Sequence, residues 1–203
     1  MQYSDIVLKA KEYVIWLLKD LESKWYTYHN LDHTLHVFDQ ASYLAEKEGL
    51  NEELQEIVQL AALFHDTGFI KQYDKNEPIW AQIAEEWLRK QWYPEDKIDL
   101  VKQTILATDP SLQNPDNKLA KIIKDADLDN LGSKEFMWCS LKLKQELENI
   151  KWLQISTDDW LKNTYKFISW LEFYTDTQKK EKWPIFEENK RKLKEMIKDD
   201  DNG

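Results

Sequence analysis

The sequence predicts an all-α protein, a helical bundle of about eight to nine helices. Apolar residues recur every three or four positions along almost the whole chain, which is the spacing of one face of a helix. No run of alternating apolar and polar residues is long enough to predict a strand. Only four of the 203 residues are glycine and five are proline, which is few for a protein built from sheets and turns.

The first four helices are predicted from apolar stripes and from the residues at their boundaries. An apolar stripe over residues 3–21 predicts the first helix. The second is expected over residues 32–48, because Gly49 is a typical residue after a helix end. Asn51 is suited to cap a third helix, and Pro78 is suited to the first turn of a fourth.

The remaining helices are predicted in the same way. Pro94 starts a fifth helix, and a sixth is expected over residues 119–131, ending at a glycine. Ser133 is a candidate cap for a seventh helix, and Ser156 begins a capping box for an eighth. Pro184 opens a last helix that is rich in Lys and Glu.

The length of the chain corresponds to one domain. We expect a single helical domain over residues 1–198, in which the chemical motifs occupy residues 26–132 and further helices occupy residues 133–198. Residues 199–203 are expected to form a disordered tail, because polar chain ends fray.

The net charge of −10 excludes some classes of partner. An acidic surface repels phosphate backbones and anionic lipids, so we expect neither general nucleic-acid binding nor membrane binding. The ten tryptophans are unusual in so polar a chain; we expect their rings to fill the core, with a stacking pocket or a homodimer interface as alternatives. A single cysteine, Cys139, and the lack of a signal-peptide pattern at the start of the sequence predict a cytoplasmic location.

The four histidines form the most informative pattern in the sequence. His29, His33 and His36 lie within the segment YHNLDHTLH, and residues three or four apart share one face of a helix. His65 continues an apolar stripe and is followed directly by Asp66. Neighbouring helical positions diverge by about 100°, so both side chains reach one ion only where the helix ends. The following Thr-Gly pair supplies such an end, and an imidazole with a carboxylate suits a divalent metal ion.

A third cluster contains the acidic residues Asp125, Asp127 and Asp129. An aspartate close to an apolar face must form an ion pair or bind a metal to offset the loss of hydration. Spacing alone does not decide which of the three points inward. Lys121 and Lys124, on the same expected helix, are interpreted as solvated.

The ordered set of His33, His65, Asp66 and Asp127 resembles the H…HD…D pattern of the HD-domain superfamily of metal-dependent phosphohydrolases. The match extends roughly over residues 26–132 and is similar to small stand-alone bacterial HD proteins. The string YHN-x-x-H also resembles a signature of the cyclic-nucleotide phosphodiesterases in that superfamily. The resemblance implies an all-helical HD-like fold.

The resemblance also implies roles for individual residues. The four residues of the pattern would ligate one divalent cation, whether Mg, Mn, Co, Ni, Zn or Fe. His29 would act as the general acid toward the leaving oxygen, and Asp66 would belong to both the catalytic and the metal-binding set. Asn30 is a candidate for substrate binding or for fixing the turn, and Lys71 for substrate binding or a solvated position. His36 would either orient a ligand or be a partly exposed helix residue.

The chain departs from the family pattern at two places. Two-metal members have further histidines after the HD pair, whereas this chain has none after His65 and carries Asn76 and Glu77 where a His-Glu pair often stands. We therefore expect one metal ion. Position 69 is Phe where the family often has Lys.

The expected activity is hydrolysis of a phosphomonoester or phosphodiester bond of a nucleotide or another small phosphorylated metabolite, with metal-bound water as the nucleophile. The alternative is a non-catalytic HD module that binds or senses a nucleotide. A di-iron oxygenase, another use of the fold, needs later histidines that this chain lacks.

Overall fold

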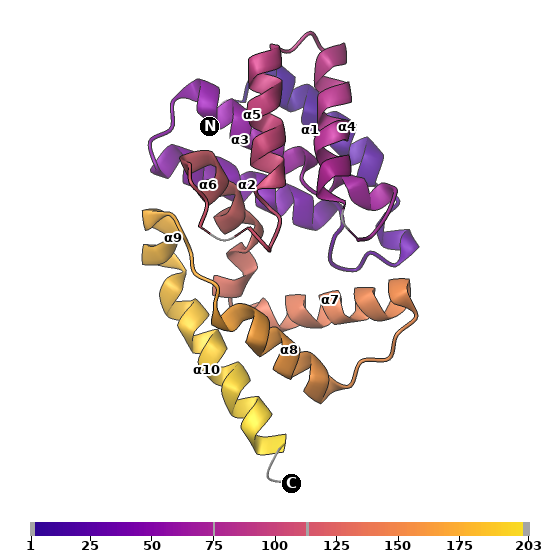
Figure 1. Ribbon diagram of the computed structural model, residues 1–203, viewed down its shortest axis with the longest axis vertical. Coiled ribbons are helices and arrows are strands. Elements are labelled where there is room, and N and C mark those ends of the chain that lie inside the picture. Colours follow the sequence, from indigo (N-terminus) through magenta and orange to yellow (C-terminus); the bar gives the residue numbers. More distant parts are fainter. Residues whose placement is uncertain (1–2, 75, 113, 201–203) are drawn as a thin grey trace.

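The computed structural model of the protein describes residues 3–74, 76–112 and 114–200 (Figure 1). These residues form helices and no strand, so the predicted all-α class is confirmed. In chain order the elements are α1 (Asp5–Leu18), η1 (Glu22–Lys24), α2 (Leu31–Lys47), α3 (Glu52–Phe64), η2 (Thr67–Ile70), α4 (Glu77–Lys90), α5 (Glu95–Leu106), α6 (Lys118–Asp127), η3 (Asp129–Gly132), α7 (Phe136–Lys151), α8 (Thr157–Ser169), α9 (Asp176–Glu181) and α10 (Trp183–Asp200), where η marks a 3₁₀ helix.

Most helix starts agree with the expected boundary residues. The side chain of Asn51 caps α3 by accepting from the N–H of Leu54, and that of Ser156 caps α8 by accepting from the N–H of Asp159. The short helix α9 was not expected, which brings the number of α-helices among the described residues to ten rather than eight to nine. Helix α10 reaches Asp200, and the rest of the predicted tail, residues 201–203, lies outside the described residues.

Two predicted boundaries were wrong. The sixth helix does not continue to residue 131 but ends at Asp127, and the tighter helix η3 follows. The next helix starts at Phe136, and Ser133 does not cap it because the Ser133 hydroxyl donates to the carbonyl of Asn130. The change of helix type after Asp127 makes this residue the last one of α6.

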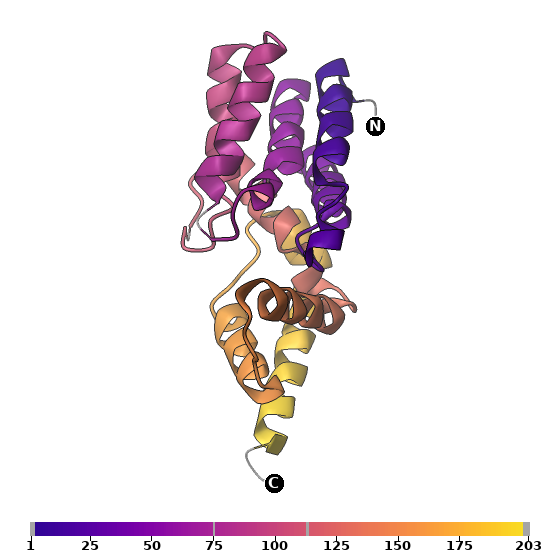
Figure 2. The same cartoon turned by 90° about the vertical axis from the view of Figure 1, so that its right-hand side faces the viewer.

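The apolar interior is divided into two clusters. Helices α1–α6 enclose the larger cluster, and η3, α7, α8, α10 and the segment before α9 enclose the smaller one. Figures 1 and 2 show the two groups at opposite ends of the long axis, with α7 lying across their boundary. The prediction of a single domain remains a prediction, and His33, His65, Asp66 and Asp127 all lie in the first group.

The expectation that the tryptophan rings fill the core was wrong for most of them. Trp80, Trp87 and Trp160 are buried. Six others are exposed: Trp16, Trp25, Trp92, Trp138, Trp152 and Trp170.

None of the helices within the described residues combines the length and the apolar character needed to cross a lipid bilayer.

Candidate metal centre

The first contribution to the centre comes from the start of α2. Asn30 is the N-cap of this helix, and its side-chain oxygen accepts a hydrogen bond from the N–H of His33 at 3.2 Å. Its amide nitrogen lies 3.4 Å from the carbonyl oxygens of Tyr26 and Thr27. Asn30 therefore fixes the turn that holds His33. Of the two roles expected for Asn30, these contacts support the structural one.

The second contribution comes from the end of α3. His65 is the C-cap residue, and its Nδ1 donates to the carbonyl of Ala62 at 2.7 Å. This bond leaves Nε2 directed at the other site residues. The hydroxyl of Thr67 donates to the carbonyl of Phe64 at 2.8 Å and closes the helix end, so that Asp66 turns toward the same point as His65.

Gly68 permits the close packing that holds this turn. A Cβ atom at this position would lie 2.1 Å from Cδ1 of Trp80, well inside any allowed contact. Trp80 is buried and comes from α4, so α4 presses directly on the backbone two residues beyond Asp66. Only glycine fits under the tryptophan ring.

The third contribution comes from α6, where the structure distinguishes the three aspartates. Asp125 is buried and accepts hydrogen bonds from the N–H groups of Tyr174 and Thr175. Asp129 accepts from Gln178 and Lys182. Asp127 is the aspartate that points toward His33 and His65.

The four side chains of the expected ligand set lie together. His33 Nε2 is 3.2 Å from Asp127 Oδ1 and 3.4 Å from Asp66 Oδ2. His65 Nε2 is 3.3 Å from Asp66 Oδ2 and 3.6 Å from Asp127 Oδ1. One ligand atom from each of His33, His65 and Asp127 lies within 4.8 Å of the others, which is the only such group of metal-ligand type found in the described residues.

Two atoms of this cluster lack hydrogen-bond partners. His65 Nε2 and Asp66 Oδ2 are buried and, within the described part of the chain, neither makes a hydrogen bond. A buried polar atom without a partner is costly, and native proteins satisfy almost all of them. Two imidazoles and two carboxylates form a donor set that suits a divalent transition metal, or Mg or Mn. The residues present therefore fit the cation that the sequence pattern implies.

The histidines and aspartates of the cluster stabilise each other's charged forms, although burial disfavours those forms. Burial raises the pKa of Asp66 and Asp127, but the neighbouring His65 and His33 outweigh it, so both pKa values lie below the usual range. Burial lowers the pKa of His65, but the nearby carboxylates of Asp66 and Asp127 outweigh it and raise the pKa well above its usual value. The two carboxylates are ionised, as ligands of a cation must be.

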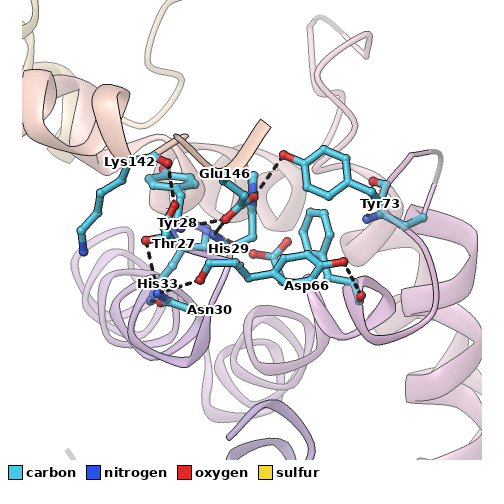
Figure 3. A network of polar contacts seen from close by, with 12 residues as sticks. Thr27, Tyr28, His29, Asn30, His33, Asp66, Tyr73, Lys142 and Glu146 are labelled. Atoms are coloured by element: carbon cyan, nitrogen blue, oxygen red, sulfur yellow. Dashed lines mark hydrogen bonds and ion pairs between the residues drawn. The ribbon is translucent and has the colours of Figure 1, made fainter. Parts of the chain in front are cut away.

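Glu146 on α7 forms a second polar group beside the cluster (Figure 3). Its Oε1 lies 2.5 Å from Nδ1 of His29 and accepts from the hydroxyl of Tyr73 at 3.1 Å. Its Oε2 accepts from the backbone N–H groups of Tyr28 at 2.7 Å and His29 at 2.9 Å. The carboxylate is fully buried and carries four contacts, so it fixes both the backbone and the ring of His29.

Glu146 and His29 each favour the charged form of the other. Burial disfavours the charged imidazole, but the hydrogen bond and charge of Glu146 outweigh it and raise the pKa of His29. Burial raises the pKa of Glu146, but the hydrogen bonds from His29 and the backbone outweigh it and the pKa is lowered. Sequence reasoning missed Glu146, because nothing in the polar segment KLKQELENI distinguishes it from its neighbours.

Four further residues that the sequence analysis singled out lie away from the cluster or make other contacts. His36 is partly exposed and its Nε2 lies 3.1 Å from Asp129 Oδ2, so it does not orient a ligand of the cluster. Lys71 is exposed at the end of η2 and does not line the cavities beside the cluster. Asn76 is buried and donates to the carbonyl of Tyr73 at 3.0 Å, and Glu77 lies in the first turn of α4.

Residues 30–129 of the chain match the family model described as the HD domain. This range contains the four residues of the cluster, whereas Glu146 lies beyond its end and His29 directly before its start. No curated protein and no solved structure gives a significant match to the chain.

Proposed function

The chain belongs to the HD-domain superfamily of metal-dependent phosphohydrolases, and from this premise we propose that it hydrolyses a phosphomonoester or phosphodiester bond of a nucleotide or another small phosphorylated metabolite. The observation that carries the proposal is the convergence of His33, His65, Asp66 and Asp127, with two buried atoms that lack hydrogen-bond partners. A single divalent cation is the ligand that satisfies them.

The four side chains would hold the cation and set the charge of the site. When bound there, a divalent cation would lower the pKa of a water molecule, the proposed nucleophile, and would neutralise charge on the phosphoryl group. The two carboxylates balance the two positive charges of the ion, so the centre does not repel an anionic substrate. Because the cluster is almost completely buried on the side of α3, substrate approaches from the side of Asp127, whose side chain is 25% exposed.

His29 is placed to protonate the leaving oxygen. Its Nδ1 is engaged by Glu146, which leaves Nε2 as the atom available to a substrate. The raised pKa favours the protonated ring, which is the form that a general acid requires. Glu146 is the positioning residue, because it acts on the reaction through His29.

A test of the proposal uses the full chain, stripped of metal with a chelator and then reloaded with one divalent ion at a time. We expect turnover of 4-nitrophenyl phosphate, bis(4-nitrophenyl) phosphate or a cyclic nucleotide that depends on the ion and disappears with chelator. Asp66→Ala is expected to lose both the bound ion and the activity.

The opposite result would be one ion bound per chain with no hydrolysis across a broad panel of nucleotides and small phosphoesters. Calorimetry on the same panel would then show whether the site binds a nucleotide without turnover, as expected of a sensing module. Either result separates the enzyme from the binding module.

A further inference from the structure

A cavity of about 380 Å³ opens directly beside Asp127 and His29, between η3, α7 and α8. Its volume falls within the range of about 300–1,000 Å³ that is typical of small-molecule sites. It borders the metal cluster on one side and the smaller apolar cluster of the protein on the other. A molecule bound there would therefore have one end at the reacting centre.

The walls of this cavity are apolar and aromatic. They include Leu128, Leu131, Phe136, Leu143, Trp160 and Phe167. The indole N–H of Trp160 already donates to the Ser140 hydroxyl at 2.9 Å, so it is not available to a ligand. No lysine, arginine or glutamate occurs among the described residues that line it, and its charged groups, Asp127 and His29, both stand at the cluster end.

A second cavity, of about 430 Å³, lies beside His33 and has the opposite character. Its charged lining residues are Lys142 and Lys182 together with Asp32, Asp129 and Glu135. The two cavities share Tyr28, Asn130 and Cys139, so these residues stand at the boundary between them. An unpaired charge in an apolar cavity is costly, so the charged groups of a substrate are disfavoured on the side of Trp160 and uncharged groups are favoured there.

We propose that the apolar cavity binds the alcohol part of the substrate, and that this part is uncharged and carries an apolar ring. This inference rests on the proposed function. In the reaction, water loses a proton and its hydroxyl group bonds to phosphorus, while the bond between phosphorus and the alcohol oxygen breaks. The departing oxygen takes a proton from His29 to give the free alcohol and phosphate, and the proton lost by the water restores the one that His29 gave. His29 lines this cavity and not the polar one, which places the leaving group on the apolar side.

The experiment compares two esters whose alcohols differ only in a distant ring, propyl phosphate and 3-phenylpropyl phosphate. Both carry the same charge and release an alcohol of similar acidity, so their intrinsic reactivity is matched. With the metal-loaded chain we expect kcat/KM for the phenylpropyl ester to be at least about tenfold higher, which corresponds to burial of one phenyl ring. Equal kcat/KM values would overturn the inference.

Three variants in α8 test whether the preference for the phenylpropyl ester arises in this cavity. Thr164 is half-buried and lines the cavity, and Thr164→Phe is expected to fill it and abolish the preference for the phenylpropyl ester. Lys166→Phe adds the same ring at an exposed position of the same helix that does not line the cavity, and should keep the preference. Phe167 is 38% exposed, so Phe167→Ala should fold and lower the preference without filling the cavity.

A binding measurement separates this inference from the proposed function. The product 3-phenylpropanol is titrated into the full chain and followed by line broadening of the ligand NMR signals, with Thr164→Phe as the comparison. Binding that Thr164→Phe abolishes supports the cavity even if no ester is hydrolysed, in which case only the proposed function fails. Hydrolysis with no alcohol binding and no ester preference overturns the inference and leaves the proposed function standing.

Discussion

Nδ1 of His29 and Oε1 of Glu146 lie 2.5 Å apart, although the two residues are 117 positions apart in the chain. The same carboxylate accepts the backbone N–H of His29, so α7 holds the candidate general acid by its ring and by its backbone. The metal cluster is built entirely from α2, the end of α3 and α6, and the acid therefore depends on a different part of the molecule.

The pair predicts how the stability of the metal-free protein depends on pH. Glu146→Gln is expected to lower the free energy of unfolding at pH 7 by about 1–3 kcal/mol, because it removes the charged partner of His29. The pKa of Glu146 is lowered in the folded state, so its contribution is present above the ordinary value of 4.5 and is lost as the pH falls through the folded-state pKa. Denaturant unfolding of both proteins between pH 7 and pH 3 should show the difference shrinking in acid; a constant difference would contradict the pairing.

His29→Asn should separate acid catalysis from metal binding. We expect the bound ion to remain and kcat for an alkyl phosphate to fall by about 10²–10⁴-fold, the usual contribution of a general acid. The loss should be much smaller for 4-nitrophenyl phosphate, whose leaving group needs no proton. Elemental analysis and kinetics with both esters provide the measurement, and equal losses for the two would exclude the role of His29 as the acid.

Removal of a metal ligand should abolish stabilisation by the ion. At an ion concentration of 100 times Kd, the wild-type chain should gain about 2.7 kcal/mol of unfolding free energy, whereas Asp66→Ala should gain almost nothing. Asp39→Ala changes an exposed aspartate on α2 and serves as the control. Thermal melts with and without Mn²⁺ test this, and a full shift in Asp66→Ala would remove Asp66 from the ligand set.

The variants Gly68→Ala and Gly49→Ala should both lower stability, but only Gly68→Ala should also weaken metal binding. Gly68→Ala forces a methyl group into the ring of Trp80, which should cost about 1–3 kcal/mol of stability and also weaken metal binding by displacing Asp66. Gly49 has a φ of +71° with open space around it, so Gly49→Ala should cost about 1–2 kcal/mol and leave metal binding unchanged. Unfolding and metal titration of both variants distinguish packing at the site from a general loss of stability.

The sequence predicted the parts that depend on local pattern. Apolar spacing and capping residues such as Asn51 and Ser156 located most helices, because helix boundaries are set by near neighbours. The order of His33, His65, Asp66 and Asp127 indicated a common site, and the structure brings these side chains together.

Contacts between distant segments could not be predicted in this way. Glu146 is one of many acidic residues, and only the packing of α7 against the loop before α2 gives it a role. Lys124 was interpreted as solvated but is buried, and its ammonium group donates to the carbonyls of Ala107 at 2.9 Å and Asp109 at 2.8 Å. The spacing of residues within a helix does not show which backbone carbonyl groups of another segment will lie beside its side chains.

The position of Glu146 beyond the end of the metal-binding segment also bears on synthesis of the protein. A ribosome delivers every residue of the cation cluster before it delivers Glu146. The ring of His29 thus gains its carboxylate partner only after α7 has been synthesised and has packed against the segment before α2.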